Sequence, residues 1–374
     1  MQILTVDVGT GTQDVFLFNP DLDLENGFKL IMPSPTMIVH NRLRQATVRA
    51  EAVLLTGVMM GGGPSQWAAR DHVRAGYPLY ATPGAARTFN DDLDWVQNEM
   101  GVRIISDDET DTLPDAVRIE LKDFDLAALA TAFATFGLTL NPDAIGVAVF
   151  DHGDSPPGYS DRQFRFDYLD QRIRAHNRLS AFAFLSNDIP PIMTRLQAVA
   201  VTHNSDAPLV VMDTAPAAVL GATFDPVAAA PERVILCNVG NFHTLAFRLG
   251  PLGVEGVFEH HTGEINQVKL ESLLERLANG TLRHADVFDD MGHGALLYST
   301  DPIAKPPLIV TGPRRALMRG SRLGPYFAAP FGDMMIAGCF GLLAAMADVL
   351  PDDEIREAIR HSMKGGAGKP PWEM

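Results

Sequence analysis

Cysteine is scarce in this sequence, and its scarcity excludes two kinds of site. Only Cys237 and Cys339 occur among 374 residues, and they do not form a CxxC spacing. A disulfide framework and a four-cysteine zinc site are therefore excluded, and so small a thiol content suits a reducing compartment. Cys237 lies in a strand-like run and Cys339 in a mostly apolar stretch, so we expect both thiols to be buried.

Basic residues are outnumbered, and no apolar run is long. The 30 basic residues face 46 acidic ones, which gives a formal charge of -16. This charge repels phosphate backbones and anionic membranes, so we expect neither nucleic acid nor a membrane as a partner. The longest apolar stretch, residues 334–347, is too short to span a bilayer, and the first strand-like run has no basic signal-peptide start before it. These features predict a cytoplasmic protein.

Apolar residues are nevertheless plentiful enough for a folded core. They make up 46% of the chain, and 374 residues suit about two domains. Apolar runs predict strands at residues 2–7, 13–18, 30–39, 52–58, 145–150 and 209–212. Helical patterns lie between them, at residues 65–75, 90–100, 125–136 and 170–183. Strands that alternate with helices in this way indicate an α/β fold.

The N-terminal pattern is then repeated. Residues 233–249, "RVILCNVGNFHTLAFRL", match the first strand, turn and strand, with Asn238 in the place of Asp7 and Gly240 in the place of Gly9. A strand at 253–260, a helix at 265–278, a strand at 307–312 and a helix at 333–349 are predicted to follow. We therefore expect a duplicated α/β unit, with lobes at 1–228 and 229–374 and the two glycine hairpins facing each other across a cleft. Neighbouring N–H groups in such turns bind anions, and phosphate is the usual occupant.

These motifs resemble those of the actin, Hsp70 and sugar kinase superfamily, whose members bind ATP between two RNase H-like lobes. The first phosphate loop of that superfamily resembles "DVGTGTQD", the second resembles "NVGNFHT", and the adenosine loop resembles "LIVTGPRRAL". The resemblance implies ATP and Mg²⁺ as cofactors. It implies nucleotide contacts from Gly9, Thr10, Gly11, Thr12, Gln13, Asn238, Gly240, Asn241, His243, Thr244, Thr311, Gly312 and Pro313. It also places the small Gly338 where the lobes meet.

The second phosphate loop departs from the superfamily pattern. It usually begins with aspartate, and this sequence has Asn238. An amide contributes no charge, so ATP binding should survive this change better than ATP hydrolysis. Asp7 keeps its charge at the end of the first strand, and we expect it to be the Mg²⁺ ligand and part of the catalytic machinery.

The whole chain is also similar to a microbial family sometimes labelled "putative pyruvate formate-lyase activating enzyme". That label implies a radical S-adenosylmethionine enzyme, in which three closely spaced cysteines hold an iron-sulfur cluster. The sequence has two cysteines, far apart. We therefore expect that the chain is not such an enzyme.

Two further groups of polar residues are candidates for chemistry. "VFDHGDSPPGYSD" places Asp151 and His152 after a buried strand, where Asp151 is either a general base tuned by His152 or a cap of the loop. "FEHHTGEIN" and "FDDMGHGA" supply ligand types for a divalent metal or an acid–base pair, although their spacing matches no metal signature. We expect this second group to bind substrate, through His260, His261, Thr262, Asp290 and His293.

The sequence thus predicts a Mg²⁺-dependent ATP phosphotransferase that acts on a small-molecule acceptor and forms, as one possibility, a homodimer. Two alternatives stay open. In the first, ATP drives closure in an activator, reactivase or chaperone-like ATPase without a phosphorylated product. In the second, the chain is a non-catalytic, actin-like assembly protein. The loop-borne histidines and aspartates favour the phosphotransferase.

Overall fold

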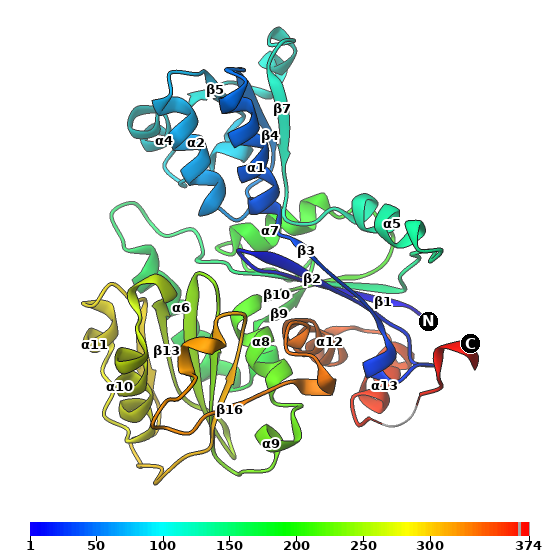
Figure 1. The fold of residues 1–374 in the computed structure, drawn as a ribbon, viewed down its shortest axis with the longest axis vertical. Coiled ribbons are helices and arrows are strands. Elements are labelled where there is room, and N and C mark those ends of the chain that lie inside the picture. Colours follow the sequence, from blue (N-terminus) through cyan, green and yellow to red (C-terminus); the bar gives the residue numbers. More distant parts are fainter. Residues whose placement is uncertain (366–367, 374) are drawn as a thin grey trace.

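The computed structural model describes residues 1–365 and 368–373. The predicted α/β class is confirmed: each of three sheets is covered by helices (Figure 1). Among the described residues, no helix has both the length and the apolar character needed to cross a membrane. Both cysteines are buried, as expected.

The first sheet has the strand order β3-β2-β1-β8-β10-β9. Its strands are β1 (Ile3–Val8), β2 (Thr12–Phe18), β3 (Phe28–Pro33), β8 (Ala144–Val149), β9 (Ala183–Leu185) and β10 (Leu209–Asp213). β1, β2 and β3 form an antiparallel meander, whereas β8 and β10 run parallel to β1. The carboxyl ends of β1, β8 and β10 therefore lie at one edge, where ligands bind in α/β sheets.

The second sheet has the order β14-β13-β12-β11-β15-β16. Its strands are β11 (Val234–Val239), β12 (His243–Gly250), β13 (Gly253–His261), β14 (Gly294–Leu297), β15 (Leu308–Thr311) and β16 (Tyr326–Phe327). Here too a meander, β11 to β13, is followed by two strands parallel to its first strand. The strands β3-β2-β1-β8-β10 of the first sheet thus correspond in order and direction to β13-β12-β11-β15-β16 of the second.

The two N-terminal hairpins of these sheets are built alike. Asp7 lies opposite Asp14 in the first, and Asn238 lies opposite Leu245 in the second, so both pairs are offset by the same 231 residues. The turns also match, because Gly9 N donates to Thr12 O at 2.9 Å and Gly240 N donates to His243 O at 3.0 Å. The hairpins therefore place equivalent backbone groups at the tip of each sheet.

A third sheet belongs to a body inserted between β3 and β8, at the top of Figure 1. Its strands are all parallel, in the order β6-β5-β4-β7: β4 (Val53–Gly57), β5 (Leu79–Ala81), β6 (Arg103–Ile104) and β7 (Val117–Leu121). The helices of this body are α1 (Pro35–Val48), α2 (Pro64–Arg74), α3 (Pro83–Ala86) and α4 (Leu93–Met100). The body has an apolar core of its own.

The remaining helices cover the two larger sheets. They are α5 (Leu126–Thr135), α6 (Asp161–His176), α7 (Thr194–Thr202), α8 (Thr214–Ala222), α9 (Pro226–Ala229), α10 (Gln267–Ala278), α11 (His284–Phe288), α12 (Ala337–Val349) and α13 (Asp353–Ser362). The predicted lobe boundary between residues 228 and 229 falls between β10 and β11 and stays a prediction. α12, from the second predicted lobe, packs on β1 and β8 of the first sheet.

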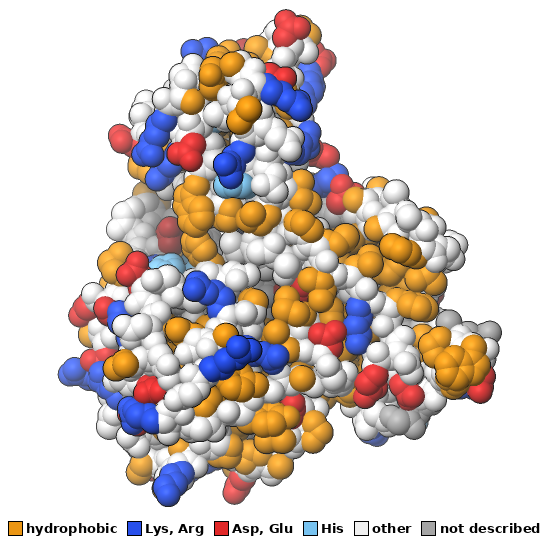
Figure 2. Space-filling model, in the orientation of Figure 1, with side chains coloured by type: hydrophobic (Ala, Val, Ile, Leu, Met, Phe, Trp, Pro, Cys, Tyr) orange, Lys and Arg blue, Asp and Glu red, His pale blue; other side chains and the backbone are white. Residues whose placement is uncertain are grey.

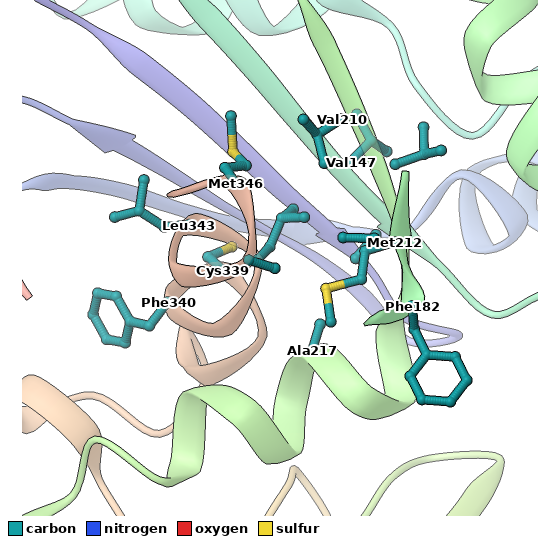
Figure 3. Packing of buried hydrophobic residues seen from close by; sticks show 14 of the residues in the cluster. Val147, Phe182, Val210, Met212, Ala217, Cys339, Phe340, Leu343 and Met346 are labelled. Carbon is teal, nitrogen blue, oxygen red and sulfur yellow. The ribbon is translucent and has the colours of Figure 1, made fainter. Parts of the chain in front are cut away.

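α8 and α12 cross at very short range. A Cβ atom at Gly341 would lie 1.9 Å from Ala217 O, and one at Gly221 would lie 1.7 Å from Ala337 O, so only glycine fits at these two positions. Figure 3 shows Cys339 and Met346 of α12 lying toward the strands that carry Val147 and Val210. This packing fixes α12 between the first sheet and α8.

Three predicted elements have other bounds in the structure. The strand predicted at 30–39 ends at Pro33, because Ser34 caps a helix whose first residue is Pro35. The helix predicted at 170–183 is α6, which begins at Asp161 and ends at His176, because Asn177 takes a left-handed conformation with φ of 40°. The predicted helix at 333–349 begins four residues later, at Ala337.

Candidate functional site

A cleft of about 1170 Å³ lies between the two larger sheets and the inserted body. Turns and strand ends of both sheets, loops of the inserted body and the start of α12 line it. Figure 2 shows the molecule hollowed below the inserted body, with histidine side chains reaching the surface near the hollow. Its volume exceeds that of most single-ligand pockets, so it has room for two small molecules.

The two glycine hairpins meet at this cleft. A Cβ atom at Gly11 would lie 2.5 Å from Asn241 Nδ2, so the tip of one turn touches the tip of the other. The predicted nucleotide residues that line the cleft are Gly9, Thr10, Thr12, Asn238, Gly240, Asn241, His243, Thr311, Gly312 and Pro313. Gly11, Gln13 and Thr244 do not line it. The Gln13 amide donates to Pro33 O at 3.0 Å, and Thr244 is buried beneath the second turn.

Two buried carboxylates face each other in the first hairpin. Thr214 Oγ1 donates to Asp7 Oδ1 at 2.5 Å, whereas Asp14 Oδ1 has no hydrogen-bond partner among the described residues. Burial raises the pKa of Asp7 to about 6. Burial and the neighbouring Asp7 raise the pKa of Asp14 to about 8. A Cβ atom at Gly338 would lie 1.8 Å from Asp7 Oδ2, so glycine there makes room for this carboxylate.

The second hairpin carries neither acid. Asn238 replaces Asp7, and Leu245, opposite Asn238, replaces Asp14. The asymmetry predicted from Asn238 therefore extends to a second position. Sequence reasoning missed Asp14, although the register of a tight hairpin would have placed it opposite Asp7.

Asp151 lies in the cleft wall, but backbone groups occupy both of its oxygens. Its Oδ1 accepts from Gly153 N at 2.8 Å, and its Oδ2 accepts from Arg195 N at 3.0 Å and Leu196 N at 2.9 Å. These bonds hold the first turn of α7 and match the capping alternative. Burial nevertheless keeps the pKa of Asp151 raised.

His152 belongs to a cluster of histidine rings from distant segments. Its Nε2 lies 3.2 Å from Nε2 of His293, and the ring of His243 stacks on Phe150 with centroids 4.1 Å apart. His261 is a neighbour, with ring centroids 5.1 Å from His243 and 4.8 Å from His293. Burial and the charges of Arg165 and Arg195 lower the pKa of His152 to about 3. Burial likewise lowers the pKa values of His243 and His293 well below the usual range, so all three rings are neutral near pH 7.

The predicted substrate residues do not form one site. None of them lines the cleft: His260, His261, Thr262, Asp290 and His293. His261 and His293 join the histidine cluster, whereas His260 Nε2 lies 3.2 Å from Asp290 Oδ2. Thr262 Oγ1 donates to Gly240 O at 2.9 Å and so supports the second glycine turn. Their role in substrate binding stays a prediction.

A buried ion-pair network lies behind the histidines. Arg165, 1% exposed, pairs with Asp213 at 2.6 Å and with Glu259 at 2.9 Å, and Asp213 also caps α8 as its position at a strand end suggested. Burial opposes the charge of Arg165, but the two carboxylates raise its pKa. Glu259 Oε1 lies 3.3 Å from His293 Nδ1. Sequence reasoning missed Arg165 and Glu259, because nothing in their local patterns indicates burial.

The cleft as a whole is acidic. Its basic side chains are Arg87 and Arg195, and Arg195 is already paired with Asp123 through bonds of 2.7 and 3.0 Å. The acids that line it are Asp7, Asp14, Asp91, Asp92, Asp94, Asp123, Asp151, Asp154 and Asp161. An anionic ligand therefore needs a cation to accompany it.

Comparison with known proteins places the chain in a family. Residues 60–317 match the family model described as "Putative pyruvate format-lyase activating enzyme (DUF1786)". The chain belongs to this family. The similarity to the microbial family with this label, drawn from the sequence, is thereby confirmed. No curated protein matches the DUF1786 chain described here.

Solved structures give weaker matches to this DUF1786 protein. The ethanolamine utilization protein EutJ from Carboxydothermus hydrogenoformans has 12% identity and a TM-score of 0.31, covering 91% of this chain and 89% of EutJ. The ROK hexokinase from Thermus thermophilus has 11% identity and a TM-score of 0.24, covering 68% of this chain and 47% of the hexokinase. An exopolyphosphatase-like protein has 8% identity and a TM-score of 0.24, covering 78% and 61%.

Proposed function

We propose that the cleft binds ATP with Mg²⁺ and that the protein transfers the γ-phosphoryl group to a small-molecule acceptor. The observation that carries the proposal is the meeting of two equivalent glycine turns, at Gly9 and Gly240, on the wall of one cleft. Successive N–H groups of such turns bind phosphate oxygens. The adenosine end of the cleft would be formed by Thr311, Gly312 and Pro313.

The residues of the first hairpin fit Mg²⁺. Asp7 and Asp14 offer buried carboxylate oxygens on one side of the hairpin, and Asp14 Oδ1 lacks a partner among the described residues. Hard oxygen ligands of this kind suit Mg²⁺, which keeps several waters and bridges to phosphates. When bound, Mg²⁺ would neutralise phosphate charge in a cleft that is otherwise acidic.

The cleft has room for an acceptor as well as ATP, and loops of the inserted body contribute Gly61, Gly62, Arg87 and Asp91 to its lining. Asp91 Oδ1 has no hydrogen-bond partner among the described residues, and its pKa is raised to about 6 by burial and by Asp154. A carboxylate with this pKa suits proton removal near neutral pH better than Asp151, whose oxygens are engaged.

One observation favours the competing reading, in which ATP drives closure without a phosphorylated product. α8 and α12, which belong to different predicted lobes, cross in close contact at Gly221 and Gly341, and movement of packed helices against each other is a common element of domain closure. The activity in the family name is not part of either proposal, because Cys237 and Cys339 are the only cysteines in the chain and both are buried.

Thermal unfolding with ATP, with and without Mg²⁺, tests the proposal. At a free ATP concentration of one hundred times Kd, binding adds about 2.7 kcal/mol to the free energy of unfolding. We therefore expect ATP to raise Tm by about 3–5 °C when Mg²⁺ is present, and to leave Tm unchanged in EDTA. Asp7→Asn and Asp14→Asn should lose most of this shift. The matched control is Asp188→Asn, an exposed aspartate that does not line the cleft.

The absence of any shift at millimolar ATP with Mg²⁺ would overturn the proposal. If ATP binds, incubation with a panel of small hydroxyl and carboxyl compounds separates the two readings. A phosphorylated compound indicates the phosphotransferase. Release of inorganic phosphate alone, unaffected by any compound, indicates the closure ATPase.

A further inference from the structure

We propose that His152, His243 and His293 together bind one divalent transition-metal ion of the zinc class. Each of the three rings offers a nitrogen, and these nitrogens all lie within 4.8 Å of one another. They come from segments that are far apart in the chain: the loop after β8, the first residue of β12 and the residue before β14. This site adjoins the proposed nucleotide site, because His243 closes the second glycine turn, but it uses none of the carboxylates of the first hairpin.

The spacing of the nitrogens fits a tetrahedral ion. Two imidazole nitrogens that each lie about 2.0–2.1 Å from one zinc ion are about 3.3–3.4 Å apart at a tetrahedral angle. The Nε2 atoms of His152 and His293 are 3.2 Å apart. Because the three nitrogens lie within 4.8 Å of one another, the rings must draw together by about 1–1.5 Å for all three to reach one ion.

A carboxylate lies behind His293. Its Nδ1 lies 3.3 Å from Glu259 Oε1 without a hydrogen bond between them, and its Nε2 lies 3.2 Å from His152 Nε2. A proton on Nδ1, facing Glu259, would leave the lone pair of Nε2 for a metal ion. A carboxylate behind a ligating histidine is the usual arrangement in metal sites, because it fixes the ring and raises its basicity. Glu259 is itself held by Arg165, so its position is fixed from both sides.

His243 has an unused nitrogen in a buried position. Its Nε2 has no hydrogen-bond partner among the described residues, and its ring is held by stacking on Phe150, with an interplanar angle of 8°. A buried polar atom without a partner destabilises the fold, and a metal–nitrogen bond would give this nitrogen a partner.

Charged groups of both signs surround the cluster. Arg165 and Arg195 are positive, and they act against a bound cation as they act against protonation of His152. The carboxylates paired with them or beside them are Asp123, Asp151, Asp213 and Glu259, and any negative charge on these groups offsets that effect.

The ligand types separate this ion from Mg²⁺. Neutral imidazole nitrogen suits zinc and its first-row neighbours, whereas Mg²⁺ prefers the carboxylate oxygens of the first hairpin. His152 and His243 both line the cleft, so a remaining coordination position would face its interior. Three protein ligands and one open position are typical of zinc sites that bind water or a substrate oxygen.

Zinc binding to the metal-free protein tests the inference, and no nucleotide is needed. After dialysis against a chelator, the wild-type chain should take up about one equivalent of Zn²⁺ and give a saturable visible absorption with Co²⁺. His152→Asn and His293→Asn should each weaken zinc binding at least 100-fold. The matched control, His361→Asn, removes an exposed histidine and should leave zinc binding unchanged.

Circular dichroism and Tm of each metal-free variant show whether it is folded. Uptake well below one equivalent by the wild type, or zinc binding by both folded variants equal to that of the wild type, would overturn the inference. If a variant does not fold, the Co²⁺ titration of the wild type decides, because an ion held only by exposed side chains gives no saturation at one equivalent. Asp14→Asn should retain zinc, so failure of the nucleotide proposal leaves this one standing.

Discussion

Asp91 shows how neighbours set the charge of one residue in the cleft. It is half-buried, and burial, with Asp154 and Asp161 next in effect, raises its pKa to about 6. An acid whose pKa is higher in the folded state stabilises the fold fully below its unfolded pKa of about 4 and loses that contribution as pH rises through 6. We expect Asp91→Asn to leave Tm unchanged at pH 4 and to raise it by about 1–2 °C at pH 8.

Thermal unfolding of Asp91→Asn and wild type at pH 4, 6 and 8, measured side by side, checks this sign. Asp188→Asn serves as the control, because Asp188 is exposed and does not line the cleft. If the Tm of Asp91→Asn falls below that of the wild type at pH 8 but not at pH 4, Asp91 stabilises the fold through its ionised form, and the prediction is wrong.

At the scale of residues, local signals were read correctly and non-local ones were missed. Asp7 is the last acid of a strand before a glycine turn, and the structure places it in the cleft. Asp14 and Glu259 look like ordinary strand residues in sequence, since their burial is set by segments that pack over them. The histidines of the cluster were individually conspicuous, but only the fold shows that His152, rather than His260, lies beside His293.

At the scale of elements, the crossing of α8 and α12 depends on two glycines. A methyl group at Gly341 would lie 1.9 Å from Ala217 O, so the helices must separate to accept it. Overpacking of this kind costs about 1–3 kcal/mol. We expect Gly341→Ala to lower the free energy of unfolding by about 3 kcal/mol, measured from urea denaturation.

The matched control for this substitution is Gly263→Ala. A Cβ atom at Gly263 has nothing within 4 Å, and its φ is not in the left-handed region, so this change should cost less than about 1 kcal/mol. Equal stability of the two variants would mean that α12 moves away from α8 without loss, and the crossing would then not be a tight contact.

Periodicity identified most elements but not their ends. The hairpins at β1–β2 and β11–β12 were predicted because a strand, a glycine turn and a strand are local features. The start of α1 was missed because the apolar run continues through Pro33, although serine followed by proline at residues 34 and 35 is a common helix start. The sequence also did not reveal that β4 to β7 form a sheet of their own, since strand pairing is a long-range property.

At the scale of the whole molecule, Arg165 joins the two larger sheets. Its partners Asp213 and Glu259 lie in β10 of the first sheet and β13 of the second. Arg165 also donates to Asp151 O at 2.8 Å and lies over the ring of Phe150. One buried guanidinium therefore fixes the distance between the sheets at the floor of the cleft and positions Glu259 behind His293.

Removal of Arg165 should therefore be costly. Arg165→Leu leaves Asp213 and Glu259 buried without their partner, and breaking a buried ion pair in this way costs about 3–5 kcal/mol. Arg174→Leu is the matched control in the same helix, because Arg174 is 67% exposed and solvent screens its pair with Asp170. Urea denaturation at pH 7 measures both. If Arg165→Leu is as stable as Arg174→Leu, the two carboxylates must become protonated or hydrated without loss, and the contact between the sheets does not depend on this ion pair.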